Sequence, residues 1–106
     1  MGARIRFLKA SVADVAGLIE HFSEEGGSAG GRFERSLEAA AGRLQAFPRI
    51  GHPLTTDNPR IRGIRSWPVP GFPDVRLYYR PDPGIVSVVR VIHGARDLSA
   101  GLGEEE

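Results

Sequence analysis

The sequence predicts an α+β domain in which a hairpin of two helices packs on one face of a small, mostly antiparallel sheet. Three observations lead to this class. A run of β-branched residues from Ile85 to Ile92 has the composition of a buried strand. Between residues 11 and 47, apolar side chains recur at helical spacing in two successive stretches. Prolines and glycines at 70–73 and 81–84 divide the second half into strand-length segments. The expected element order is β-α-α-β-β-β.

Length and composition are those of one ordinary domain. With 106 residues, of which 41% are hydrophobic and 25% charged, the chain is large enough for a single modest core. The domain is expected at residues 4–97, followed by a loose acidic tail at 98–106. No apolar run approaches the roughly 20 residues needed to cross a bilayer, and the N-terminus lacks the apolar segment of a secretory signal. A cytoplasmic protein is therefore expected. Because the chain has no cysteine and no other ligand spacing, neither a metal nor a cofactor is expected.

The first strand and the first helix are predicted from alternation followed by helical spacing. Arg4 to Leu8 alternate between charged and apolar residues, so Ile5 and Phe7 are expected to face inward. Ser11, with Asp14 three residues later, resembles a capping box and predicts the start of a helix of about 11 to 13 residues. The apolar positions of this helix are Val12, Val15, Leu18, Ile19 and Phe22.

The second helix carries the clearest apolar stripe in the chain. Ser28 is expected to cap this helix, and Pro48 is expected to end it. Its apolar side chains recur at steps of four and three residues, so they are expected to pack on the sheet. These side chains are Phe33, Leu37, Ala40, Leu44 and Phe47.

The second half is expected to form a loop and three strands. Residues 49–60 contain prolines and a glycine and predict a surface loop. Residues 61–69 predict a strand, and Pro68 within it favours an edge position or an interruption. The segment 75–80 alternates and predicts a second strand of this group. The strand at 85–92 is expected to lie at the centre of the sheet.

Polar side chains cluster just past the end of the last strand, where a rigid element often supports a site. His93, Arg96 and Asp97 supply an imidazole, a guanidinium and a carboxylate. Gly94 is expected to take a backbone shape that a β-carbon resists, which would turn Arg96 and Asp97 back towards the sheet. Each polar residue also has a purely structural interpretation, as an anchor of the C-terminal segment. Residues 48–97 carry eight arginines and four aspartates, a local excess of positive charge.

A set of spaced residues extends from the second helix to residue 97. It comprises Phe33, Leu37, Leu44, Pro48 and Gly51, then Ile64-Arg65, Val69-Pro70-Gly71-Phe72-Pro73, Tyr79-Arg80 and Val91-Ile92-His93-Gly94-Ala95-Arg96-Asp97. In this order and spacing, residues 4–97 resemble the RelE/ParE superfamily, the toxins of bacterial type II toxin–antitoxin modules. The final segment resembles the V-x-H-G-x-R-D ending of the ParE-like, plasmid-stabilisation branch. The resemblance implies the same β-α-α-β-β-β fold.

The resemblance also implies one of two toxic activities. ParE-like members poison DNA gyrase by binding, and RelE-like members cleave mRNA at the ribosome. Metal-free cleavage needs cations at the scissile phosphate and groups that move protons. The resemblance places Arg76, His93 and Arg96 near the basic and histidine positions of RelE-like enzymes, which makes them the candidate catalytic residues. The tyrosine that commonly follows in RelE-like enzymes is absent after Asp97, and the ending favours the ParE-like branch. A family member that has lost toxicity is a third alternative.

The resemblance further implies a cognate, ParD-like antitoxin from a separate chain, forming a hetero-oligomer with the toxin. The antitoxin is expected to be acidic where it meets the basic second half. Expected antitoxin contacts are Val15, Leu18, Phe22, Trp67 and Phe72. Expected target contacts, with gyrase or alternatively the ribosome and mRNA, are Arg65, Arg90, Arg96 and Asp97. Arg90 interrupts an apolar strand and is expected on its solvent-facing side. His21 and His52 are expected to be surface residues.

Overall fold

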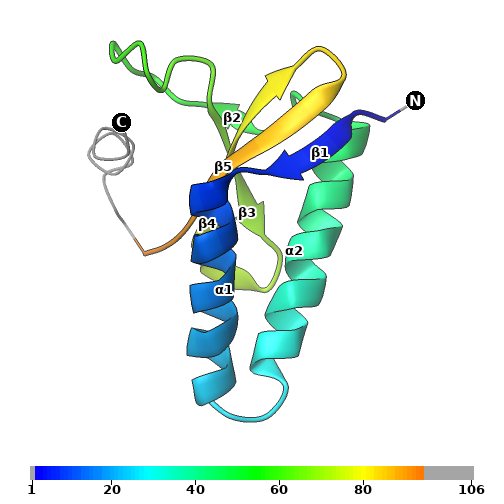
Figure 1. Ribbon diagram of the computed structural model, residues 1–106, viewed down its shortest axis with the longest axis vertical. Helices are drawn as coiled ribbons and strands as arrows, with labels where there is room; N and C mark the ends of the chain where they lie inside the picture. The colour runs from blue at the N-terminus through cyan, green and yellow to red at the C-terminus, as the bar shows by residue number, and fades with distance from the viewer. Residues whose placement is uncertain (1, 95–106) are drawn as a thin grey trace.

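Two helices and a five-stranded sheet form the described part of the molecule, residues 2–94, in the computed structural model (Figure 1). The elements are β1 (Arg4–Phe7), α1 (Lys9–Glu24), α2 (Ala29–Ala46), β2 (His52–Pro53), β3 (Arg65–Val69), β4 (Phe72–Asp82) and β5 (Ile85–His93). The chain follows α1, turns, and returns along α2, so the helices lie antiparallel. The predicted α+β class and the order of its main elements are confirmed. The short strand β2 lies inside the segment predicted as a loop.

The strands are arranged in the order β1-β5-β4-β3-β2. β1 pairs with β5 in parallel, and every other neighbouring pair is antiparallel. β5 therefore has a neighbour on each side, but the middle position belongs to β4. A β-bulge interrupts the β4–β5 ladder between Tyr78 and Tyr79. Because of the extra residue in β5, Val88 and Val91 both belong to the core under the helices, while Val89 belongs to a second cluster on the other face.

The main core lies between the helices and the sheet. Alternate side chains of β4 and β5 point towards the helices, and the apolar stripe of α2 packs against them. Fully buried members of this core include Phe33, Leu44, Val69, Val75, Leu77, Tyr79, Val86 and Val88. The inward orientation predicted for Ile5 and Phe7 is confirmed, since both side chains pack partly buried against this core.

A smaller apolar cluster covers the opposite face of the sheet. Ile61 and Ile64 are buried there with Val89 and Ile92, and Leu54 and Tyr78 are partly buried against them. The prediction of a strand from residue 61 is wrong, because β3 begins at Arg65. Ile61 and Ile64 belong to the loop before β3, and their side chains are buried without strand pairing of their backbone.

The start of α1 differs from the prediction. The helix begins at Lys9 and has 16 residues, and Leu8 at its N-cap makes no side-chain capping bond. Ser11 is fully buried, and its Oγ donates a hydrogen bond to the Leu8 carbonyl at 2.8 Å. The predicted capping box at Ser11 and Asp14 is therefore absent, because Ser11 already lies inside the helix. Val12 is 54% exposed and does not contribute to the core.

The second helix follows its predicted stripe with one exception. The side chains from Phe33 to Leu44 on the stripe are buried. Phe47 is 55% exposed and stands beyond the end of the helix, where the Arg43 guanidinium lies 5.5 Å from its ring centroid. Ser28 occupies the N-cap position without a side-chain capping bond. The prediction that Phe47 packs on the sheet is wrong, because the chain leaves its helical path at that residue.

Candidate functional site

The free edge of β5 is closed by an acidic side chain from α1. β1 ends at Phe7, which pairs with Val88, and β5 continues beyond it. At that point both carboxylate oxygens of Asp14 bind Arg90, with Nε to Oδ2 at 2.7 Å and Nη2 to Oδ1 at 2.9 Å. Asp14 Oδ2 also accepts a hydrogen bond from the Val91 backbone N–H at 2.9 Å.

This arrangement corrects the expected orientation of Arg90. Its side chain is only 16% exposed, as is that of Asp14. The prediction that Arg90 faces solvent is therefore wrong, because the Asp14 carboxylate of α1 binds its guanidinium at the strand edge. The expected contact between Arg90 and a target protein stays a prediction, and it would have to involve a side chain that is already held in an ion pair.

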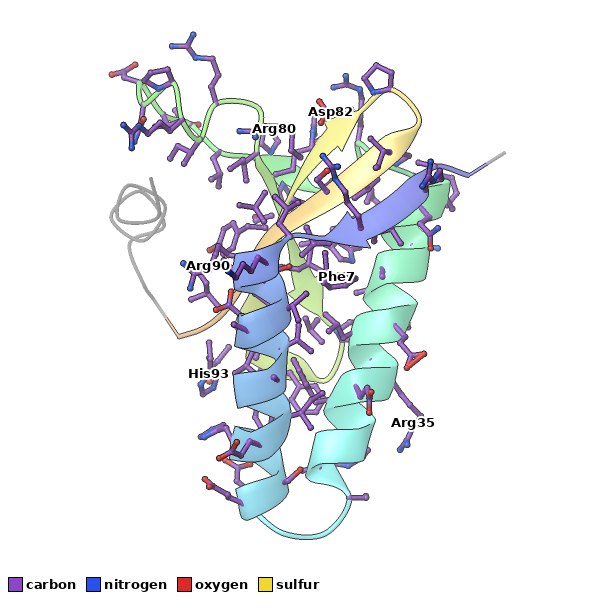
Figure 2. The ribbon with its side chains drawn as sticks, in the orientation of Figure 1. Phe7, Arg35, Arg80, Asp82, Arg90 and His93 are labelled. Carbon is purple, nitrogen blue, oxygen red and sulfur yellow. The ribbon has the colours of Figure 1, made fainter. Side chains whose placement is uncertain are left out.

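His93, the last residue of β5, lies against the lower half of α1. Its ring centroid is 5.2 Å from that of His21 and 5.6 Å from that of Phe22 (Figure 2). Together with Asp14 and Arg90, His21 and His93 border a shallow hollow of about 360 Å³. His21 is on the surface as expected, and its Nε2 lies 3.6 Å from Glu25 Oε2.

The backbone leaves the sheet at Gly94 as the sequence predicts. The φ angle of Gly94 is +89°, a region that residues with a β-carbon rarely adopt. Its N–H donates to the Asp74 carbonyl at 2.8 Å. Arg96 and Asp97 lie outside the described residues, so the expected cluster with His93 stays a prediction.

Arg76 lies on the other face of the sheet from His93. In the β4–β5 ladder, His93 is opposite Val75 and Arg76 is opposite Ile92. Paired residues share a face, and successive residues alternate between faces. Val75 belongs to the core under the helices and Ile92 to the cluster on the far face. Arg76 Nη2 donates to Ser66 Oγ at 3.2 Å on that far face. The structure therefore does not bring these two candidate catalytic residues together.

Four arginines converge near the start of β3 and the end of β4, and of these the sequence pointed only to Arg65 as a site residue. Arg49, Arg62, Arg65 and Arg80 border a hollow of about 340 Å³ together with Pro53, Gly63, Pro81 and Asp82. We call this group of four the arginine pocket. The residues come from four separate segments, so no local sequence pattern marks them. The general excess of arginine over acid at 48–97 is the one signal that points to this region.

Backbone carbonyls hold two of these guanidinium groups in place. Arg65 Nη1 donates to the Gly51 carbonyl at 2.8 Å and the Arg49 carbonyl at 3.1 Å. Arg80 Nη2 donates to the Arg60 carbonyl at 3.1 Å and the Arg62 carbonyl at 3.4 Å. These are neutral acceptors, so the positive charges are positioned without being neutralised.

The buried phenol of Tyr79 supports the wall of the arginine pocket. Its oxygen accepts a hydrogen bond from the Gly51 backbone N–H at 2.9 Å. Burial raises the pKa of the Tyr79 phenol above its ordinary value, while the bond from Gly51 and the positive charges of Arg65 and Arg49 act in the opposite direction. A β-carbon at Gly51 would lie 2.6 Å from the Tyr79 hydroxyl and 2.7 Å from the Ser66 carbonyl oxygen. Gly51 therefore allows a close backbone approach that no other residue permits.

An apolar groove lies between α1 and α2 and shares no lining residue with the arginine pocket. We call it the helix groove, and it has a volume of about 340 Å³. It is lined by Phe7, Val12, Val15, Leu37 and Ala41, with Glu34 and Glu38 along one side. Figure 2 shows Phe7 between the upper turns of the helices. The two glutamates make one rim acidic.

The expected antitoxin contacts fall into different surroundings. Val15 lines the helix groove. Leu18 and Phe22 are buried in the core, at 9% and 7% exposure, which leaves little of either side chain for a partner. Trp67 and Phe72 are partly buried against the same core. Leu18 and Phe22 therefore belong to the core, and their expected contact with an antitoxin stays a prediction.

Within residues 2–94, no group of three or more His, Asp or Glu side chains could hold a metal ion. Across those same residues, no helix is both long and apolar enough to span a membrane.

The chain matches a family model over most of its length. Residues 5–98 match the ParE toxin of the type II toxin–antitoxin system, parDE. The chain belongs to this family, and the predicted membership of the RelE/ParE superfamily is confirmed. No curated protein sequence matches the chain.

Two solved structures share the fold over nearly their whole length. A chain of the chromosomal ParDE toxin–antitoxin system from P. aeruginosa superposes with a TM-score of 0.70 at 13% identity, covering 88% of this chain and 97% of that chain. A chain of the toxin–antitoxin complex RelBE2 from Mycobacterium tuberculosis gives a TM-score of 0.62 at 25% identity, covering 88% and 99%. Both relatives support the β-α-α-β-β-β fold.

Proposed function

We propose that this member of the ParE toxin family acts by binding DNA gyrase and does not cleave RNA. The observation that carries the proposal is the separation of Arg76 and His93 by the sheet. His93 faces α1, while Arg76 faces Ser66 on the other side. RNA cleavage without a metal requires cations and proton-transferring groups that converge on one phosphodiester. A toxin that works by binding has no such requirement.

We also propose a cognate, ParD-like antitoxin that forms a hetero-oligomer with this chain. The helix groove supports this proposal, because it is apolar at its base and has an acidic rim. An amphipathic helix can lay its apolar face in such a groove, with Val12 and Val15 among its contacts. Basic side chains on that helix would complement Glu34 and Glu38. A basic helix in the helix groove differs from the acidic antitoxin segment expected to meet residues 48–97. The arginines of residues 48–97 do not line the helix groove.

Two assays with purified protein test the proposed activity. In the first, the parent protein should inhibit DNA supercoiling by gyrase. In the second, ribosome-bound mRNA should remain intact at the same toxin concentration. Arg76→Ala should leave the inhibition of gyrase unchanged, since its guanidinium bonds a serine within the sheet.

Codon-dependent mRNA cleavage that Arg76→Ala abolishes would overturn the proposal in favour of a RelE-like mRNA endonuclease. If the folded protein affects neither gyrase nor mRNA, the alternative of a family member without toxicity replaces it. The proposed antitoxin is tested separately. The product of a neighbouring short reading frame should co-purify with this chain.

A further inference from the structure

We propose that the arginine pocket binds the phosphate backbone of duplex DNA. This inference goes beyond the proposed gyrase inhibition, because it concerns a direct contact between the toxin and nucleic acid. The pocket brings four guanidinium groups to one hollow, and among residues 2–94 Asp82 is the one acidic residue in its lining. Across residues 2–94, no ion pair joins any of these four arginines to a carboxylate.

The geometry favours an anion that is not supplied by the described chain. Arg65 and Arg80 are each fixed through one terminal nitrogen by carbonyl oxygens, so their other N–H groups keep a defined direction. Arg49 and Arg62 are exposed, and their side chains make no hydrogen bond to the described residues. A guanidinium presents paired donors that match phosphate oxygens, and prior fixation lowers the entropy lost on binding.

The surroundings favour a polyanion over a single free anion. Arg80 and Arg76 lie on the same face of β4, four residues apart, which places their backbone positions about 13 Å from each other. On β1, Arg4 and Arg6 alternate with the inward Ile5 and Phe7, and Arg6 Nε donates to Ser87 Oγ at 2.9 Å. Positive charge therefore continues from the pocket along the face of the sheet away from the helices. Duplex DNA carries one negative charge per roughly 1.7 Å of its axis, which suits an extended basic face.

The pocket lining also distinguishes a duplex from other partners. Its apolar residues are Pro53 and Pro81, and it contains no aromatic side chain. Single-stranded nucleic acid is usually held by aromatic rings on which its bases stack. Protein partners are usually anchored by large apolar or aromatic side chains in a pocket that fits them. The phosphate backbone of duplex DNA, whose bases are stacked inside the duplex, needs neither aromatic rings nor large apolar anchors.

The test measures binding of the full-length protein to a fluorescent DNA duplex of arbitrary sequence at several salt concentrations. The parent should bind with a strong salt dependence. The double variant Arg49→Ala/Arg62→Ala should bind roughly 10- to 100-fold more weakly at low salt, and its slope of log affinity against log salt should be shallower by about 2. Neither side chain makes a hydrogen bond to another described residue, so the variant should melt like the parent.

The control variant Arg32→Ala/Arg35→Ala removes the same charge from α2. Arg35 lies on the outer side of α2, far from Arg80 (Figure 2), so this variant should bind like the parent. An equal loss in both variants would overturn the proposal, because net charge alone would then explain binding. So would an absence of DNA binding by the parent.

Three competitors complete the experiment. Inorganic phosphate should displace the duplex no better than chloride at equal ionic strength. A poly-glutamate peptide and a single strand of the same length should each bind more weakly than the duplex. Specific displacement by phosphate would make this a free-phosphate site and overturn the proposal. Tighter binding of poly-glutamate or of the single strand would overturn it in favour of an acidic protein or an unpaired strand. No gyrase is present, so the result is independent of the proposed function.

Discussion

Asp14 of α1 and Arg90 of β5 form a two-point ion pair at the edge of the sheet, with nitrogen–oxygen distances of 2.7 and 2.9 Å. Because Asp14 also accepts the Val91 backbone N–H, its carboxylate takes the place that a neighbouring strand would occupy. An exposed strand edge invites pairing with another chain. The ion pair therefore joins the helix to the sheet and closes part of this edge at the same time.

Removing the Asp14 carboxylate should destabilise the fold. In Asp14→Ala, Arg90 and the Val91 N–H both lose the Asp14 carboxylate as an acceptor, and hydrogen bonds to charged groups contribute about 1.5–3 kcal/mol each. We expect the free energy of unfolding in urea to fall by about 2–3 kcal/mol. Glu20→Ala, an exposed position on the same helix, should change it by less than about 0.5 kcal/mol. Equal losses in the two variants would show that the ion pair contributes no stability of its own.

A β-carbon at Gly51 should also destabilise the protein, whereas one at Gly42 should not. At Gly51 the added atom would meet the Ser66 carbonyl oxygen at 2.7 Å, and this backbone atom cannot move aside. Gly51→Ala should cost about 1–3 kcal/mol, as overpacking does. A β-carbon at Gly42, within α2, would meet no described atom within 4 Å beyond the adjacent helix backbone, so Gly42→Ala should raise stability by about 0.5–1 kcal/mol. Thermal melting of the two variants tests both expected changes in stability. A Gly51→Ala protein as stable as the parent would contradict the expected steric clash.

Tyr79→Phe should weaken the fold at neutral pH and change its response to alkali. The buried Gly51 N–H would lose its acceptor, at a cost of about 1–3 kcal/mol. Tyr78→Phe serves as the matched control, because the Tyr78 phenol has no hydrogen bond among the described residues.

The alkaline effect follows from the sign of the pKa shift. Burial raises the pKa of Tyr79 above 10.0 in the folded protein. The contribution of the protonated Tyr79 phenol to the free energy of unfolding is therefore fully present below pH 10. It is lost as the pH rises through the folded-state pKa, because the unfolded chain releases the phenol proton more easily than the folded protein does. Urea unfolding across this range should show a steeper alkaline fall for the parent than for Tyr79→Phe. Parallel curves would contradict the expected shift.

A charge placed in the helix groove should separate antitoxin binding from stability. Val12 is 54% exposed and lines the groove, so Val12→Glu should leave the melting temperature nearly unchanged. It should weaken antitoxin affinity by at least roughly tenfold, because a carboxylate would be buried without a partner beside Glu34 and Glu38. Ala39→Glu, an exposed α2 position outside the groove lining, should bind normally. Calorimetric titration measures both affinities, and unchanged binding by Val12→Glu would exclude this groove as the antitoxin site.

Elements whose signal is local could be predicted from the amino-acid sequence alone. The β-branched run of β5, the apolar stripe of α2 and the left-handed backbone of Gly94 depend on residues close together in the chain, so periodicity and composition predict them. Local signals fail where a side chain has a distant partner. Ser11 and Asp14 have the spacing of a capping box, but Asp14 instead binds Arg90, 76 residues away.

Which polar side chains meet depends on how distant segments pack together in three dimensions. Strand alternation places neighbouring residues on opposite faces, and the pairing register then determines that Arg76 and His93 are separated by the sheet. The arginine pocket gathers side chains from the turn after α2, the loop before β3, and strands β3 and β4. Their proximity arises from the pairing of β3 with β4 and from the bond between Gly51 and Tyr79. Such long-range contacts depend on the register and packing of the whole sheet, which no single segment of the sequence specifies.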